Sequence, residues 1–378
     1  MRKQTKLGLM DVWVLGSVLV LLVMGVWLVF DASFAKTADA KWAGNDPWYF
    51  VKRQALFAAA GLFVMWLVSR IRLSKLLKIT TPLLVMSVIM LIGVMVPGIG
   101  YRVNGALRWI KLGPISVQPS EIAKLALVLY LARLLAEQKN AVRRLDQRWL
   151  PPACIVGLIS GLVFIEPDLG TAIAIVSVCF LMLFAAGARK IHLGGMLGLG
   201  TLFAIAAIKL EPYRMDRIRI WQHPWKYRYG DGYQVVHSLI ALGTGGWHGV
   251  GLCEGREKTY IPAASTDFIF STLAEELGLI GCLILLAAFI FFIYRGLDVA
   301  RRSKSSYANL LAVGVTSMIG MQALINMAVV SASIPATGVP LPFISYGGSS
   351  LVLMLAGIGI LLAVSRQTGE DMELGSKR

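Results

Sequence analysis

The stretch LGLIGCLILLAAFIFFIY, Leu277–Tyr294, contains no charged side chain and is long enough to cross the apolar core of a membrane as a helix. Comparable apolar runs recur along the chain of 378 residues. The sequence therefore predicts an all-α polytopic membrane protein that forms a single integral membrane domain, residues 1–378. Ten spans are predicted, near residues 12–30, 54–70, 79–97, 119–136, 150–165, 170–187, 193–209, 273–294, 307–330 and 349–365.

The composition agrees with this class of protein. Hydrophobic residues make up 57% of the chain and charged residues only 15%, whereas a soluble protein carries about 25% charged residues. The net charge of +16 comes from basic residues that cluster between the apolar runs. Such clusters set the topology of membrane proteins, so we expect no nucleic-acid partner. The four cysteines show no spacing typical of a disulfide framework or a metal site.

Lysine and arginine also predict the orientation of the chain. Basic residues concentrate at the amino terminus and in alternate loops, which places those loops and both termini in the cytoplasm. Residues 210–272, between the seventh and eighth spans, then form one long extracytoplasmic loop. The cytoplasmic clusters are Arg2, Lys3 and Lys6; Arg70, Arg72, Lys75 and Lys78; Lys139, Arg143, Arg144 and Arg148; Arg189 and Lys190; and Arg295, Arg301, Arg302 and Lys304.

Ionisable residues accompany the outer end of the fourth predicted span. Glu121 and Lys124 are three residues apart, so they share one helix face just inside the membrane boundary. They form either a structural ion pair or part of a functional site, because ionisable residues in spans are costly and often mark a site. The preceding loop carries Arg108 and Lys111 on either side of Trp109, a pattern typical of a segment at the membrane interface.

Two further outer segments are rich in polar groups. In IEPDLGTA, residues 165–172, we favour a structural turn in which Asp168 caps the next helix over a role for its acids in a site. The long loop alternates arginines, including Arg214 and Arg217, with aromatic residues. This pattern fits either an amphipathic segment on anionic lipid or a cradle in which guanidinium groups hold phosphate oxygens and aromatic rings cover sugars.

Three acids precede the apolar run Leu277–Tyr294. In STDFIFSTLAEELG, residues 265–278, Asp267 lies at the outer membrane boundary, where it is either the N-cap of the following helix or a general base. Partial burial would raise the pKa of its carboxyl group into a range useful for a base. Glu275 and Glu276 follow about two helical turns later. We predict that they orient the helix or pair with a cation.

Five motifs of this chain resemble those of one protein family, in the same order. The motifs are NGALRWIKLG with VQPSEIAK, EPDLGTA, DGYQVVHSLIALGTGG, STDFIFSTLAEELG and GVPLPFISYGGSS. They are similar to the motifs of the shape, elongation, division and sporulation (SEDS) family, whose members include FtsW, RodA and SpoVE. The stretch NDPWYFVKRQALF, residues 45–57, is more similar to the FtsW and SpoVE branch.

The resemblance implies a ten-helix fold and peptidoglycan glycosyltransferase activity. The expected substrate is lipid II, an undecaprenyl-pyrophosphoryl disaccharide-pentapeptide, which is polymerised into β-1,4 glycan strands for septal cell-wall synthesis. The expected location is the bacterial cytoplasmic (inner) membrane. The expected partners are a class B penicillin-binding protein, which is a transpeptidase, divisome or elongasome proteins, and membrane lipid. The expected cofactor is a Mg²⁺ or Mn²⁺ ion held through the substrate pyrophosphate, and we expect no organic cofactor.

The resemblance also assigns residues to the site. Asp267 matches the family's catalytic carboxylate, and Trp109, Glu121 and Lys124 match its functional tryptophan, glutamate and lysine. We predict that the substrate-binding residues are Trp109, Lys111, Glu121, Lys124, Arg214, Arg217, Gln234, Thr266 and Ser345. An accessory glutamate that some relatives carry eight residues before the catalytic aspartate is Thr259 here, so that role does not transfer.

Other functions compete with this one. A lipid II flippase would place polar residues along the whole depth of its spans, whereas the unusual polar residues here gather on the outer side. A scaffold that only recruits a transpeptidase would not require Asp267. Within the family, elongation (RodA) and sporulation (SpoVE) polymerases are the alternatives to a division enzyme.

Overall fold

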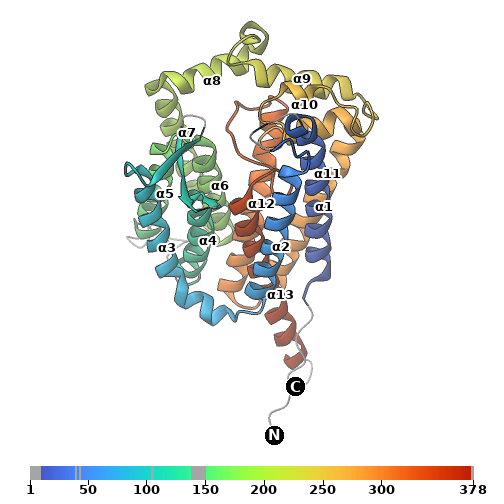
Figure 1. Cartoon of the computed structure of the whole chain (residues 1–378). Coiled ribbons are helices and arrows are strands. Elements are labelled where there is room, and N and C mark those ends of the chain that lie inside the picture. Colours follow the sequence, from blue (N-terminus) through green and yellow to red (C-terminus); the bar gives the residue numbers. More distant parts are fainter. Residues whose placement is uncertain are drawn as a thin grey trace.

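The computed structural model describes residues 10–38, 41, 44–103, 106–113, 115–137 and 150–375. The predicted basic clusters at Arg2, Lys3 and Lys6 and from Lys139 to Arg148 lie outside the described residues. The described chain is a bundle of long helices, and the prediction of an all-α polytopic membrane protein is confirmed (Figure 1).

Each predicted span coincides with a helix. These helices are α1 (Val12–Ala38), α2 (Tyr49–Ser69), α3 (Leu73–Met95), α4 (Pro119–Glu137), α5 (Leu150–Ile165), α6 (Leu169–Ala185), α7 (Lys190–Leu210), α11 (Ile269–Arg302), α12 (Ser306–Val330) and α13 (Gly348–Gly375). Among the described residues, 7 helices are long and apolar enough to cross a membrane; α5 and α6 are apolar but shorter. The remaining helix, α4, carries the charged residues Glu121 and Lys124. The number of spans therefore stays a prediction.

The predicted long loop is largely helical. Residues 210–272 contain α8 (Pro212–Gln222), the 3-10 helix η3 (Pro224–Tyr227), α9 (Tyr233–Gly245) and the short α10 (Glu257–Tyr260). These elements cover one end of the bundle, at the top of Figure 1. Helix α1 begins and α13 ends at the opposite end, in agreement with the expectation that both termini lie on one side of the membrane.

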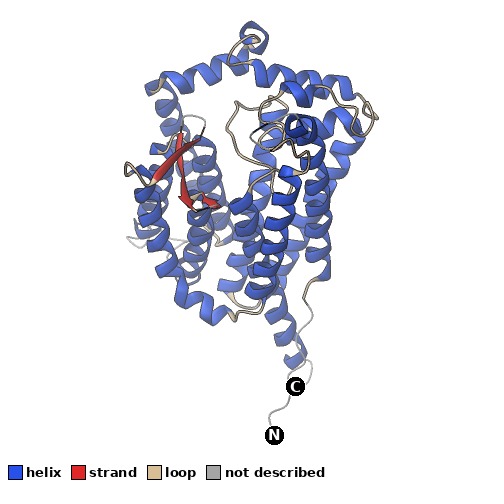
Figure 2. Cartoon of the chain, viewed as in Figure 1, coloured by secondary structure: helices blue, strands red, loops and turns tan. Residues whose placement is uncertain are grey.

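A small antiparallel sheet interrupts the helical fold between α3 and α4. It consists of β1 (Gly100–Val103), β2 (Ala106–Leu112) and β3 (Ile115–Val117), in the order β1-β2-β3. Figure 2 shows it in red at the side of the bundle, below α8. Trp109 of β2 pairs with Tyr101 of β1. The sequence indicated a segment at the membrane interface here but did not predict its strands, which satisfy one another's backbone groups.

Helix α11 begins four residues before the predicted span and is broken at Gly278, where φ is 62° and ψ is −160°. A residue with a Cβ atom rarely adopts this backbone conformation, which explains why a glycine occupies this position. The break lets the loop after α9 dock on α11. The amide of Leu279 donates to the carbonyl of Gly246 (2.9 Å), and the amide of Val250 donates to the carbonyl of Glu275 (3.0 Å).

The core lies around α12, α13 and α4. Most of α12 and α13 is buried inside the protein, whereas α7 exposes most of its apolar surface, as expected of a helix that faces lipid. Helix α12 nevertheless carries the buried polar side chains Gln322 and Asn326, which are 2% and 1% exposed. Polar groups at such depth require partners, and their partners lie in the site described next.

Candidate active site

Asp267 lies two residues before α11, at the end of the bundle that the α8–α9 segment covers. Its side chain is half-buried. The N-cap position of α11 is Phe268, which makes no capping hydrogen bond through its side chain. The interpretation of Asp267 as the N-cap is therefore wrong, and its carboxylate is available for another role.

The electrostatic surroundings of Asp267 suit a base. Burial, followed by the charge of Asp168, raises the pKa of the Asp267 carboxyl from 3.8 to about 6, while Arg108 and Arg217 oppose this rise. A pKa of about 6 leaves the carboxylate ionised at neutral pH and makes it a stronger base than an ordinary aspartate. Asp267 thus lies within the field of one further acid and two guanidinium groups.

Arg108 comes from β2 and is held in place by the EPD turn. Its Nε donates to the carbonyl of Glu166 at 3.2 Å, a second nitrogen donates to the carbonyl of Pro167, and Nη1 lies 3.7 Å from Oδ2 of Asp168. The sheet that the sequence did not predict therefore delivers this cation to the site. The sequence indicated only an interfacial position for Arg108, because its position beside Asp267 depends on the fold.

The two acids of the EPD turn behave differently. Asp168 caps α6 by accepting a hydrogen bond from the amide of Thr171 at 3.2 Å, so the predicted cap is confirmed. Glu166 is 2% exposed, and neither of its carboxylate oxygens has a hydrogen-bond partner among the described residues. Burial, with the charge of Asp168 adding to it, raises the pKa of Glu166 to about 8. Glu166 is thus largely protonated at neutral pH.

Thr266 and Ser345, both predicted site residues, meet directly beside Asp267. The hydroxyl of Ser345 donates to the carbonyl of Thr266 at 2.6 Å and accepts a hydrogen bond from the amide of Leu341 at 2.7 Å. Arg217, on α8, donates to the carbonyl of Ala336 in the same loop between α12 and α13. The structure therefore brings Thr266, Ser345 and Arg217 together around Asp267.

Glu121 and Lys124 form a second group, within the membrane-spanning part of the bundle. Lys124 Nζ lies 2.7 Å from Glu121 Oε1, and both side chains are 5% exposed, so the ion pair that the spacing predicted is confirmed. Lys124 also donates to Oε1 of Gln322 at 2.7 Å, and Ser350 donates to Oε2 of Glu121 at 3.1 Å. The pair thereby links α4 to α12 and α13.

The other predicted substrate-binding residues lie apart from this group. Arg214 donates to the carbonyls of Ala207 (3.1 Å) and Phe164 (3.4 Å), which fastens α8 to the ends of α7 and α5. Lys111 is exposed on β2 and Trp109 is half-buried there, while Gln234 is half-buried in the first turn of α9. No described contact joins these residues to Asp267, and their binding role stays a prediction.

Glu275 and Glu276 hold the long loop rather than face Asp267. Glu276 Oε1 lies 2.5 Å from Lys258 Nζ, so the predicted pairing with a cation is confirmed for this residue. Lys258 also lies 2.5 Å from Oδ1 of Asp31 on α1. Glu275 Oε1 accepts the amide of Arg256 at 2.7 Å, which supports the predicted orienting role.

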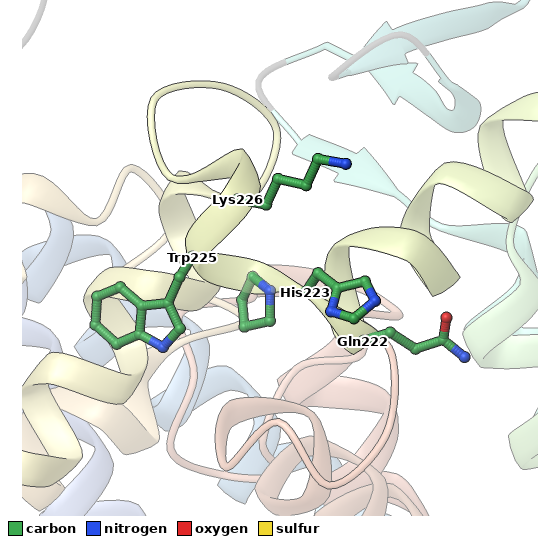
Figure 3. A pocket seen from close by; sticks show the side chains of 5 residues that line it. Gln222, His223, Trp225 and Lys226 are labelled. Atoms are coloured by element: carbon green, nitrogen blue, oxygen red, sulfur yellow. The ribbon is translucent and has the colours of Figure 1, made fainter.

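A separate open pocket lies where α8 joins η3. Its volume is about 440 Å³, and its lining includes His223, Trp225 and Lys226 (Figure 3). These residues belong to the basic and aromatic stretch whose pattern fits either a lipid-contacting segment or a phosphate cradle. The pocket contains none of the predicted site residues, and both interpretations stay predictions.

Metal-binding potential is limited in the described part of the chain. Across residues 10–137 and 150–375, apart from the short gaps given above, no group of three or more histidine, cysteine or acidic side chains is arranged to hold a metal ion. A Mg²⁺ ion bound mainly through substrate phosphates needs only one or two carboxylates from the protein. Binding of such an ion through the substrate therefore stays a prediction.

Comparison with known proteins places the chain among relatives along nearly its whole length. Residues 12–370 match the family FTSW_RODA_SPOVE, described as cell cycle protein. The chain is 40% identical over 351 residues to stage V sporulation protein E of Bacillus subtilis, covering 92% of this chain and 94% of that protein. It is 38% identical over 364 residues to a probable peptidoglycan glycosyltransferase FtsW of Coxiella burnetii, covering 95% and 96%.

Solved structures share the fold. A chain from a study of how a peptidoglycan synthase complex coordinates polymerization and crosslinking superposes with a TM-score of 0.78 at 30% identity, covering 95% of this chain and 98% of that one. The rod shape determining protein RodA of Thermus thermophilus superposes with a TM-score of 0.70 at 29% identity, covering 95% and 97%.

Proposed function

The chain belongs to the family of FtsW, RodA and SpoVE, and we propose that it is a peptidoglycan glycosyltransferase that polymerises lipid II with Asp267 as its general base. The observation that carries this proposal is the environment of Asp267. Its carboxylate lies at the end of the bundle that α8 and α9 cover, its pKa is raised to about 6 by burial, and it feels the charges of Arg108 and Arg217. Relatives named as probable peptidoglycan glycosyltransferases match almost the full chain.

The reaction requires a proton acceptor at one point and positive charge at another. A sugar hydroxyl of the acceptor attacks the sugar carbon of the donor that carries the pyrophosphate. The new glycosidic C–O bond forms as the old C–O bond breaks, and the bonding electrons leave with the pyrophosphate. Asp267 takes the hydroxyl proton, and general-base help of this kind is worth about 10²–10⁴-fold in rate.

Positive charge near Asp267 stabilises the leaving group. Arg108 and Arg217 are the guanidinium groups whose fields reach Asp267, and fixed cations aimed at developing negative charge are a large source of catalysis. We propose that Lys111 adds to this charge. A Mg²⁺ or Mn²⁺ ion held mainly by the substrate pyrophosphate would neutralise further charge. Unchanged polymerisation by the purified protein after complete chelation would exclude the ion.

The membrane, the cellular role and the partner of this protein are also part of the proposal. The protein is a multi-pass membrane protein, and we place it in the bacterial cytoplasmic membrane, with the end covered by α8 and α9 facing outward. The stretch at residues 45–57 supports the FtsW and SpoVE branch over the RodA branch. We propose a role in division, and 40% identity to a sporulation protein keeps sporulation as the alternative. The proposed partner is a class B penicillin-binding protein, in keeping with the similar chain studied in a peptidoglycan synthase complex.

Purified protein, with its partner transpeptidase and labelled lipid II, tests the proposal directly. We expect glycan polymer from the unchanged protein, none from Asp267→Asn, and normal polymer from Asp216→Asn. Asp216 is the matched control because it is an exposed acid of α8, paired with Arg219. Polymer from Asp267→Asn would refute the assignment of the base. Movement of lipid II across a vesicle membrane without polymerisation would favour the flippase, and neither activity would favour the scaffold.

A further inference from the structure

The peptide segment that carries Asp267 is fastened at three successive carbonyl groups. The carbonyl of Ser265 accepts from the amide of Tyr346 at 2.8 Å, and that of Thr266 accepts from the hydroxyl of Ser345 at 2.6 Å. The carbonyl of Asp267 itself accepts from Nδ2 of Asn326 at 2.7 Å. The first two donors belong to the loop between α12 and α13, whereas Asn326 belongs to the helix α12.

Asn326 uses one amide group to join two segments. Its Nδ2 donates to the carbonyl of Asp267 and also to the carbonyl of Val339 at 2.8 Å. Both partners are carbonyl oxygens, so only the amide nitrogen can face them. Asn326 is 1% exposed and its Oδ1 has no partner among the described residues. The amide nitrogen of the side chain thus points at these two carbonyls, while its buried amide oxygen is left without a hydrogen bond, which costs free energy.

The joined segments are the two sides of the proposed site. Gly338, next to Val339, has φ of +73°, and a Cβ placed on it would lie 3.5 Å from Oδ2 of Asp267. The loop that Asn326 holds therefore lies directly against the Asp267 carboxylate. Holding Val339 to the backbone of Asp267 fixes how closely the carboxylate approaches this loop.

Asn326 is also connected through α12 to the second polar group of the bundle, the pair of Glu121 and Lys124. Gln322 is one helical turn earlier on α12, accepts from Lys124 at 2.7 Å and donates to the carbonyl of Pro340 at 3.0 Å. Gln322 and Asn326 therefore hold adjacent carbonyls of the same loop. The buried ion pair of α4 and the segment of Asp267 are connected through this face of α12.

We propose that Asn326 is a positioning residue for polymerisation, which sets the Asp267 carboxylate against the Gly338 loop. This inference rests on the proposed function, in which Asp267 takes the proton of the acceptor hydroxyl. A group that holds a base in place affects the chemical step more than it affects binding. A misplacement of about 1 Å lowers the rate by roughly 100-fold.

The test compares Asn326→Ser with Thr316→Val in the purified protein. Thr316 is a buried residue of the same helix whose hydroxyl has no partner among the described residues, so its substitution is a matched control. We expect Asn326→Ser to lower kcat by roughly 100-fold, with KM for lipid II within about two-fold of the unchanged protein. Thr316→Val keeps both constants.

A purely structural role would give a different pattern. Activity would then fall only in proportion to the folded fraction seen in a thermal melt, and the pH dependence of the remaining rate would match that of the unchanged protein. This outcome would overturn the inference, as would full activity. We expect instead that the pH at which the rate falls is displaced, because Asp267 moves relative to Asp168, Arg108 and Arg217. Should Asn326→Ser not fold, the isosteric Asn326→Asp, which at most donates one hydrogen bond, is judged by the same criteria.

The Asp267→Asn protein separates failure of this inference from failure of the proposed function. If Asp267→Asn is inactive and Asn326→Ser is normal, the base stands and the positioning role falls. If Asp267→Asn polymerises lipid II, the proposed function of Asp267 falls, whatever Asn326 does.

Discussion

Replacing Lys258 by methionine removes the cation that two buried carboxylates share. Lys258 Nζ lies 2.5 Å from Asp31 on α1 and 2.5 Å from Glu276 on α11, and the lysine side chain is 9% exposed. Burial opposes its charge, but the hydrogen bonds to Asp31 and Glu276 outweigh burial and raise the pKa of Lys258. The contribution to stability is therefore present at neutral pH and is lost only as the pH rises through that raised pKa.

The expected cost of Lys258→Met is large because it leaves two acids without their counter-ion. Removing one partner of a buried ion pair destabilises a protein by about 3–5 kcal/mol. The same change at an exposed pair costs at most about 1 kcal/mol. Lys52 supplies the matched control, since its pair with Asp46 has side chains that are 68% and 32% exposed.

The assay is unfolding of each detergent-purified variant, by heat and by denaturant at neutral pH. We expect Lys258→Met to unfold well before the unchanged protein and Lys52→Met to match it. Adding Glu276→Gln to Lys258→Met should recover part of the loss, since one unpaired charge disappears. Equal stability of Lys258→Met and Lys52→Met would show that the buried cluster does not hold the long loop on the bundle.

Three other substitutions give outcomes of known direction. Burial raises the pKa of Asp267 from 3.8 to about 6, so its ionisation opposes folding by an amount that grows above about pH 4 and is complete above about pH 6. Asp267→Asn should therefore add about 3 kcal/mol to the free energy of unfolding at neutral pH and little below about pH 4. Denaturant titration at the two pH values checks this, and equal gains at both would contradict it. Lys124→Met should lower the free energy of unfolding by about 3–5 kcal/mol, because it leaves the buried Glu121 carboxylate without its partner. Adding Glu121→Gln to the same chain should restore most of this stability, and melting temperatures check both expectations. Gly278→Ala should lower the melting temperature, because φ is +62° and the new Cβ would lie 2.4 Å from the amide nitrogen of Gly249. The control Gly93→Ala should leave the melting temperature unchanged, since nothing lies within 4 Å of its new Cβ. An unchanged melting temperature for Gly278→Ala would argue against the break in α11.

Much of the helical architecture could be predicted from the sequence because each span is a local property. An apolar run of sufficient length fixes a helix without reference to its neighbours, and the predicted spans coincide with helices. The i,i+3 spacing of Glu121 and Lys124 likewise predicted a pair that the structure confirms. The cap at Asp168 was predicted for the same reason, since its partner is three residues away.

Features that depend on distant partners could not be predicted in this way. The break at Gly278 lies inside a uniformly apolar run, and only the docking of the loop at Gly246 explains it. The sheet was missed because its short strands contain too few residues for a clear alternating pattern. Arg108 and Asn326 reach the site from positions far away in sequence. A polar residue inside a span was nevertheless a signal that could have drawn attention to Asn326.

The pH dependence of polymerisation shows whether Asp267 is the general base. Initial rates on labelled lipid II are measured from about pH 4.5 to about pH 8 with the purified protein and its partner transpeptidase. Asp267 must be ionised to accept a proton, so we predict that the rate at limiting substrate falls about tenfold per pH unit below about pH 6, the raised pKa of this residue. A rate that stays constant down to about pH 4.5, or a Asp267→Asn protein with the same profile, would contradict the assignment of Asp267 as the base.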